Sequence, residues 1–210
     1  MANMITLLRF GLLFVLVAMA YQAPPSWQLI NMPLLFVIIA LDGLDGYVAR
    51  KRHETTAFGS IFDIAVDRIV EYVLWIVLAD LDLIPIWVAL VFIVRGTIVD
   101  SIRYGAITDG ETAFGMMRSP IGKFLVAGRF MRGFYGAVKA VTFGWVLLMQ
   151  PLPAVDPGLW VTWHGMFNLV TAALVGISVT ICLVRGLPVI IEFAMGSGLL
   201  GPNATAGDRR

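Results

Sequence analysis

Long apolar runs, broken by short polar connections, extend along almost the whole chain of 210 residues. A helix needs about 20 consecutive, mostly apolar residues to cross the hydrocarbon core of a bilayer. Six runs approach or exceed that length, at residues 5–20, 29–44, 60–79, 84–104, 123–149 and 160–184. This pattern predicts an all-α integral membrane protein with six transmembrane helices.

The composition agrees with that prediction, since 59% of the residues are hydrophobic, 14% are charged and the mean hydropathy is +0.87. So few charges would not cover the surface of a soluble domain, whereas lipid solvates the outside of a membrane protein. The length suits a single domain, expected at residues 1–195, with a loosely ordered tail at residues 196–210. The one cysteine, Cys182, cannot form an intramolecular disulfide and is expected to be buried.

The positions of the charges predict the orientation in the membrane. The connections after the first, third and fifth runs, residues 22–26, 80–82 and 150–157, contain no Lys or Arg. Basic residues lie at the other ends of the runs and in the C-terminal tail: Arg50, Lys51, Arg52, Arg103, Arg118, Arg185, Arg209 and Arg210. The positive-inside rule then places both termini in the cytoplasm of a multi-pass protein of the cell (inner or cytoplasmic) membrane.

Four aspartates flank the connection between the second and third predicted helices. Asp42 and Asp45 are three residues apart, and Asp63 and Asp67 are four apart. Each pair therefore shares one face of its helix. Because the two helices are consecutive and antiparallel, we expect the four carboxylates to meet at their joined cytoplasmic ends.

Such a cluster of acids calls for a counter-charge. Carboxylates crowded in a low dielectric repel one another, and without a cation some would have to take up protons. Hard oxygen ligands with no nearby His or Cys suit Mg²⁺ or Mn²⁺, with Ca²⁺ as an alternative occupant. The competing interpretation is a set of structural acids that pair with Arg50, Arg68 and Arg95.

Small residues accompany the acids. Gly46 and Gly59 remove side chains from the acidic faces, and Ala49 is also small, which allows a flat or phosphorylated ligand to approach the backbone. Close packing of membrane helices is the alternative explanation for small residues. Arg50 has a guanidinium that can bind a phosphate through two parallel hydrogen bonds.

Together these positions resemble the motif of the CDP-alcohol phosphotransferase family. The motif is Asp42-x-x-Asp45-Gly46-x-x-Ala49-Arg50, eight further residues, and Gly59-x-x-x-Asp63-x-x-x-Asp67. The N-terminal Asn3-x-x-Thr6-x-x-Arg9 is similar to the family's first span, and Arg95 and Arg103 resemble family positions in the fourth.

The resemblance implies a reaction and a set of roles. A phosphatidyl group would pass from a CDP-linked lipid, such as CDP-diacylglycerol, to the hydroxyl of a polar alcohol, and CMP would leave. Asp67 would be the general base, and the metal ligands would be Asp42, Asp45, Asp63 and Asp67. The nucleotide would be held by Asn3, Thr6, Gly46, Ala49, Arg50 and Gly59. Family members are usually homodimers, and no nucleic acid is expected as a partner.

Cations around the polar, Gly-rich stretch of residues 105–122 point to the acceptor. A phosphorylated alcohol, such as glycerol 3-phosphate or an inositol phosphate, would be bound by Arg95, Arg103, Arg118 and Lys123. Gly122-Lys123 resembles a Gly-Lys pair of members that accept glycerol phosphate. Positive-inside topology alone also explains such charges, and Gly96 and Phe124-Leu125 depart from those members, so serine, choline or a second lipid stay open as acceptors.

Three other functions compete with this one. A carrier or channel using the acids as an ion site would more often show broken helices or a repeated half near the midplane. A membrane prenyltransferase would need a second Asp-rich motif and more spans. A catalytically silent scaffold would be expected to lack an essential acid. His53 and His164 have no partner at ligand spacing and are expected at the surface.

Overall fold

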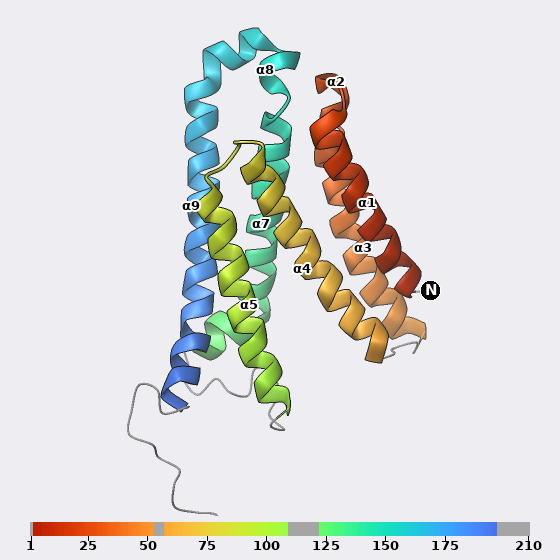
Figure 1. Ribbon diagram of the computed structural model, residues 1–210, viewed down its shortest axis with the longest axis vertical. Coiled ribbons are helices and arrows are strands. Elements are labelled where there is room, and N and C mark those ends of the chain that lie inside the picture. Colours follow the sequence, from red (N-terminus) through yellow and green to blue (C-terminus); the bar gives the residue numbers. More distant parts are fainter. Residues whose placement is uncertain (1, 53–56, 109–121, 197–210) are drawn as a thin grey trace, which may run out of the picture. The chain divides into compact units, whose positions relative to one another are not determined.

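The computed structural model describes residues 2–52, 57–108 and 122–196, and within these ranges the regular structure is helical, with no strand (Figure 1). The six long helices are α1 (Ala2–Gln22), α3 (Asn31–Arg52), α4 (Ala57–Asp80), α5 (Ile86–Thr108), α7 (Arg129–Met149) and α9 (Pro157–Gly196). The short elements are α2 (Pro25–Gln28), the π-helix η1 (Lys123–Ala127) and α8 (Leu152–Val155). The all-α prediction is confirmed, and each predicted run overlaps one long helix.

Four segments in the described part of the chain are long and apolar enough to cross a membrane: Met4–Gln22, Pro25–Leu44, Phe130–Val155 and Pro157–Met195. Helices α4 and α5 are long enough, with 24 and 23 residues, because a helix rises about 1.5 Å per residue. Charged residues lie within both helices, among them Asp63, Asp67 and Glu71 on α4 and Arg95 and Arg103 on α5. The prediction that these two helices also span the bilayer stays a prediction.

Two helix boundaries differ from the pattern. The fifth apolar run is divided at Gly128, which lies between η1 and α7. A Cβ atom there would collide with the carbonyl oxygen of Phe124 in η1, so this position requires glycine. The sixth run is longer than expected, since α9 continues past Pro188 to Gly196. Of the predicted tail, residues 197–210 lie outside the described residues.

The chain forms two compact units, and it passes between them inside three helices, α5, α7 and α9. Unit 1 comprises Met1–Ala89 and Val138–Gly176, and unit 2 comprises Leu90–Ala137 and Ile177–Arg210. In unit 1, α1 packs against both α3 and α4. The expectation of one domain at residues 1–195 stays a prediction.

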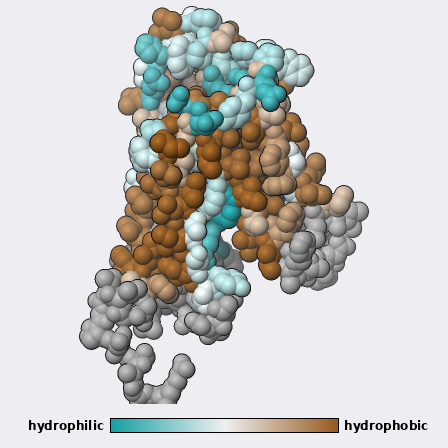
Figure 2. Space-filling model, viewed as in Figure 1, coloured by the Kyte–Doolittle hydropathy of each residue, from teal (hydrophilic) through white to brown (hydrophobic). Residues whose placement is uncertain are grey.

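The core of unit 1 explains how α1 is held. Leu13 and Leu16 of α1 are fully buried, and Leu35 of α3 is too. Trp75 of α4 is also buried, and its ring lies 4.5 Å from that of Phe143 on α7. The opposite faces of these helices expose large apolar side chains, which appear as brown surface in Figure 2. A surface of that kind suits contact with lipid.

Side-chain hydrogen bonds fasten the end of unit 1 that carries α2 and α8. Gln28 donates its amide to the carbonyl oxygen of Ala20 at 3.2 Å, and Gln150 donates to the same oxygen at 2.7 Å. The hydroxyl of Tyr21 donates to Asp80 at 2.6 Å. These bonds join the end of α1 to α2, to α4 and to the residue that follows α7.

One buried hydrophobic cluster of unit 2 contains Val99 of α5, Val126 of η1 and Val189 of α9. Cys182 of α9 is fully buried and free, as expected.

Candidate functional site

Three of the four predicted metal ligands lie together in unit 1. Asp42 comes from α3, and Asp63 and Asp67 come from successive turns of α4. One carboxylate oxygen from each lies within 4.8 Å of the other two. Asp45 belongs to α3, but its side chain lies outside the described part of the structure. The helical spacing read from the sequence thus brings at least three carboxylates to one place.

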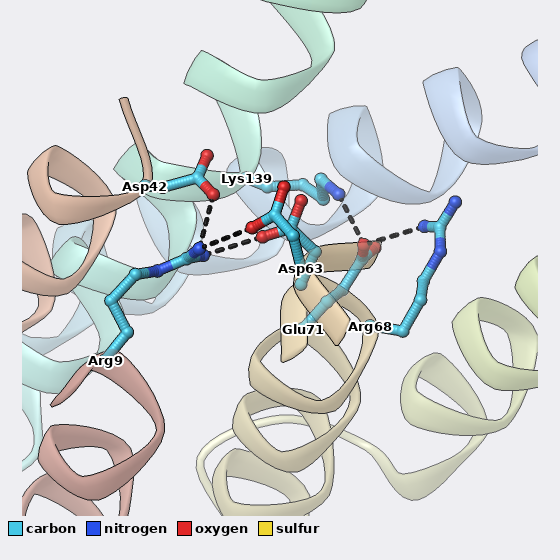
Figure 3. Close-up of polar contacts among 7 residues, drawn as sticks. Arg9, Asp42, Asp63, Arg68, Glu71 and Lys139 are labelled. Atoms are coloured by element: carbon cyan, nitrogen blue, oxygen red, sulfur yellow. Dashed lines mark hydrogen bonds and ion pairs between the residues drawn. The ribbon is translucent and has the colours of Figure 1, made fainter. Parts of the chain in front are cut away.

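Arg9 of α1 reaches into this acidic cluster (Figure 3). One terminal nitrogen lies 2.6 Å from Oδ1 of Asp42 and 3.3 Å from Oδ1 of Asp63. The other lies 2.6 Å from Oδ1 of Asp67. The arginine side chain is only 3% exposed, whereas the three carboxylates are 40–48% exposed. The site is therefore closed on the side of α1 and open on the side of the acids.

The charges of the cluster favour a further cation. When all four groups are ionised, three carboxylates and one guanidinium leave a net charge of −2. The donor set consists of hard oxygen atoms, with no His or Cys among the grouped residues. These residues fit a divalent ion such as Mg²⁺ or Mn²⁺.

The comparisons with known proteins agree with this geometry. A sequence model of the CDP-alcohol phosphatidyltransferase family matches residues 1–155, which include α1, α3 and α4 and all three clustered aspartates. The chain belongs to this family. The resemblance read from the sequence motif is confirmed, and the family supports a transferase of substituted phosphate groups in phospholipid synthesis.

One relative in the family has a more specific name. Over 89 residues the chain is 34% identical to a CDP-diacylglycerol–glycerol-3-phosphate 3-phosphatidyltransferase of Bacillus subtilis (strain 168). The match covers 42% of this chain and 46% of that protein. The chain therefore spans about half the length of the relative.

The residues that the family motif assigns to the nucleotide are placed in part. Thr6 of α1 is 3% exposed and lies one turn before Arg9, on the same buried face of the helix. Gly59 is half-buried and precedes Asp63 by one turn of α4. The other four belong to α1 and α3, and their side chains lie outside the described part: Asn3, Gly46, Ala49 and Arg50.

The predicted acceptor residues that are described belong to unit 2. Arg95 packs on α9 so closely that a Cβ atom at Gly186 would lie 2.7 Å from its Nε. Arg103 is 3.9 Å from Asp100 on the same helix. Lys123 begins η1, but its side chain lies outside the described part, as does the whole of Arg118.

A second ion cluster lies on α4, one turn beyond Asp67, and the sequence analysis did not predict it. The side chain of Glu71 is 12% exposed. Its Oε2 atom forms ion pairs with Nζ of Lys139 on α7 at 2.7 Å and with a terminal nitrogen of Arg68 at 3.3 Å (Figure 3). The sequence contained a signal, because Asp63, Asp67 and Glu71 recur every four residues and so share one helix face. The partner on α7 could not be identified without the tertiary structure.

Arg185 makes contacts that the sequence analysis did not predict. It is 5% exposed within α9, and it donates to the carbonyl oxygens of Leu125 at 2.7 Å and Val126 at 3.4 Å. Its guanidinium also lies 5.4 Å from the ring centre of Tyr135. Arg185 therefore fastens η1 to α9. His164 is exposed, as expected, and His53 lies outside the described residues.

Proposed function

We propose that this family member transfers a phosphatidyl group from a CDP-linked lipid, such as CDP-diacylglycerol, to the hydroxyl of a polar alcohol and releases CMP. The observation that carries the proposal is the convergence of Asp42, Asp63 and Asp67, with ligand oxygens within 4.8 Å, in a chain that belongs to this family. Asp45 completes the proposed set of metal ligands, and Mg²⁺ or Mn²⁺ is the proposed ion.

The bound ion would supply charge neutralisation, because displacement at a diphosphate builds negative charge on the leaving and equatorial oxygens. Asp42, Asp45 and Asp63 would hold it, with Asp67 next to it. In the reaction, the acceptor oxygen forms a bond to the phosphorus that carries the lipid, and the bond from that phosphorus to CMP breaks. The hydroxyl proton passes to Asp67.

The general base is proposed to be Asp67, from its position in the family motif. Its side chain is 48% exposed, so an acceptor hydroxyl can approach it. A positioned base typically contributes about 10²–10⁴-fold to the rate.

The donor nucleotide is assigned to a surface next to the carboxylates. Thr6 lies one turn from Arg9, and Gly59 lies one turn from Asp63, so both are near the cluster along their own helices. The absence of a side chain at Gly59 and Gly46 leaves room for a ribose or base against the backbone. The full proposed set is Asn3, Thr6, Gly46, Ala49, Arg50 and Gly59.

The acceptor is proposed to carry a phosphate, as glycerol 3-phosphate or an inositol phosphate does. The name of the Bacillus subtilis relative includes glycerol 3-phosphate, which favours the first. Arginine binds phosphate through a planar pair of donors, and the proposed binding residues are Arg95, Arg103, Arg118 and Lys123. A carrier or channel, the alternative considered from the sequence, is not favoured by the family or by the relative.

The setting of the enzyme is also part of the proposal. We propose six spanning helices from the apolar runs, and cytoplasmic termini with an active site at the cytoplasmic surface of the cell membrane from the charge distribution. A homodimer is proposed from the family alone.

An acceptor panel tests the proposed function. Purified protein in lipid nanodiscs would receive CDP-diacylglycerol, Mg²⁺ and, one at a time, glycerol 3-phosphate, inositol phosphate, inositol, serine or choline. We expect CMP release that depends on glycerol 3-phosphate or inositol phosphate. CMP release with serine, choline or inositol alone would reject the phosphorylated acceptor, and no CMP with any alcohol would reject the transferase.

A further inference from the structure

Arg9 contacts the same three carboxylates that are grouped as ligands for a metal ion. Its two terminal nitrogens lie 2.6, 3.3 and 2.6 Å from Oδ1 of Asp42, Asp63 and Asp67. A cation bound by these acids must therefore share them with a positive charge that belongs to the protein.

The surroundings of Arg9 hold it in that place. The residues on its face of α1 are buried at spacings of three and four residues, namely Thr6, Leu13, Leu16 and Ala20. α1 also packs against both helices that supply the acids, α3 and α4. With 3% of its side chain exposed, the guanidinium has little contact with solvent and depends on the carboxylates to offset its charge.

We propose, on the basis of the function proposed above, that Arg9 sets the affinity of the aspartate cluster for its divalent ion by competing for the same carboxylates. A divalent ion also needs near-complete coordination by oxygen. Binding of the ion therefore weakens one or more of the contacts between Arg9 and the aspartates. The guanidinium is then available to the anion next to the site, which is the donor's diphosphate.

Competition of this kind couples the two ligands. A diphosphate that takes up the guanidinium leaves the carboxylates to the ion, so each ligand raises the affinity for the other by the same factor. The planar fork of arginine suits both partners, because carboxylate and phosphate oxygens have similar spacing. Arg9 would then be a positioning residue that links metal binding to donor binding.

Mn²⁺ binding tests the proposal, measured by electron paramagnetic resonance on the full chain in nanodiscs, with and without CDP. Removal of one positive charge at contact distance favours a divalent ion, so Arg9→Met should bind Mn²⁺ at least about tenfold more tightly than the native chain. In the native chain CDP should tighten Mn²⁺ binding, and in Arg9→Met this effect should be smaller, because only the direct attraction between the ion and the diphosphate is left. A merely structural role predicts the reverse order of affinities, since misplaced carboxylates bind Mn²⁺ more weakly.

Two further variants complete the design. Arg68→Met removes the same charge from α4, but Arg68 pairs with Glu71, so its Mn²⁺ affinity and its response to CDP should stay within about threefold of native. Arg9→Lys keeps the charge but loses the fork, so it should bind Mn²⁺ a few-fold more tightly and respond less to CDP than the native chain.

Unchanged or weaker Mn²⁺ binding in Arg9→Met would overturn the proposal. If Arg9→Met does not fold, unchanged Mn²⁺ binding and an intact response to CDP in Arg9→Lys would overturn it. No Mn²⁺ binding by the native chain would reject the metal site itself. Native Mn²⁺ binding without CMP release with any alcohol would reject only the reaction, so the two failures are distinguishable.

Discussion

The three carboxylates of the cluster all contact Arg9, but in the proposed reaction only Asp67 takes up a proton. Asp63 and Asp67 lie one turn apart on α4 and differ in partner distance, with Arg9 at 3.3 Å and 2.6 Å. Both lose their negative charge on conversion to Asn, yet the consequences differ. With the roles proposed above, loss at Asp63 would weaken ion binding, whereas loss at Asp67 would also remove the proton acceptor.

Asp67→Asn should therefore lower kcat by about 10²–10⁴-fold while the KM for CDP-diacylglycerol changes by less than about tenfold. Steady-state CMP release at saturating acceptor measures both constants. Asp80→Asn is the matched control, because Asp80 lies at the far end of α4 and pairs with Tyr21. Normal turnover in Asp67→Asn would show that another group takes the proton.

The sequence predicted the positions of some residues of the site but not of others. The spacing of Asp42, Asp63 and Asp67 predicted their convergence, because a helix repeats its faces every three to four residues. The place of Arg9 could not be predicted, since its partners lie more than 30 residues away in the sequence. A charge inside an apolar run requires a partner, but only the packing of α1 against α3 and α4 identifies it.

At the scale of helices, the contact of Glu71 with Lys139 joins α4, which carries two of the acids, to α7. Both side chains are largely buried, at 12% and 16% exposure, and their charged atoms are 2.7 Å apart. Removal of one member of a buried pair leaves the other charge without compensation. Glu71 also pairs with Arg68 at 3.3 Å, so it compensates two cations.

Lys139→Met should lower the free energy of unfolding by about 1–3 kcal/mol, and Glu71→Gln should lower it further because it affects both cations. Thermal unfolding, followed by circular dichroism in detergent, measures the Tm of the native chain, of Lys139→Met and of Glu71→Gln, which we expect to fall in that order. Asp82→Asn is the control, since Asp82 is exposed with φ of 57° and Asn tolerates that backbone conformation. A Tm for Glu71→Gln equal to that of the control would contradict the ion cluster.

The helices themselves were largely predictable, because apolar runs long enough to span a bilayer form helices to satisfy their backbone groups. The break at Gly128 could not be predicted, because residues 123–149 form one continuous apolar run in the sequence. It arises from the π-helix η1, whose Leu125 and Val126 carbonyl oxygens accept hydrogen bonds from Arg185. Arg185 lies 60 positions after Leu125 and 59 after Val126 in the sequence, so local periodicity gives no signal of these hydrogen bonds.

At the scale of the whole molecule, the residues that match the family model do not coincide with either compact unit. Residues 1–155 match the family, whereas unit 1 comprises Met1–Ala89 and Val138–Gly176. The clustered aspartates and Arg9 belong to unit 1, and the described cations proposed for the acceptor belong to unit 2. The donor half of the reaction therefore has its proposed residues within one unit.

The central claim is that this chain uses its aspartate cluster and a divalent ion to release CMP from a CDP-linked lipid. The most direct measurement is CMP release from CDP-diacylglycerol as a function of free Mg²⁺, for the native chain and for Asp63→Asn, with glycerol 3-phosphate as acceptor. We predict no release in EDTA, recovery with Mg²⁺ in the native chain, and at least a hundredfold lower rate for Asp63→Asn, roughly the size expected when a key charge-stabilising group is lost. CMP release that persists in EDTA, or that is undiminished in Asp63→Asn, would contradict the account.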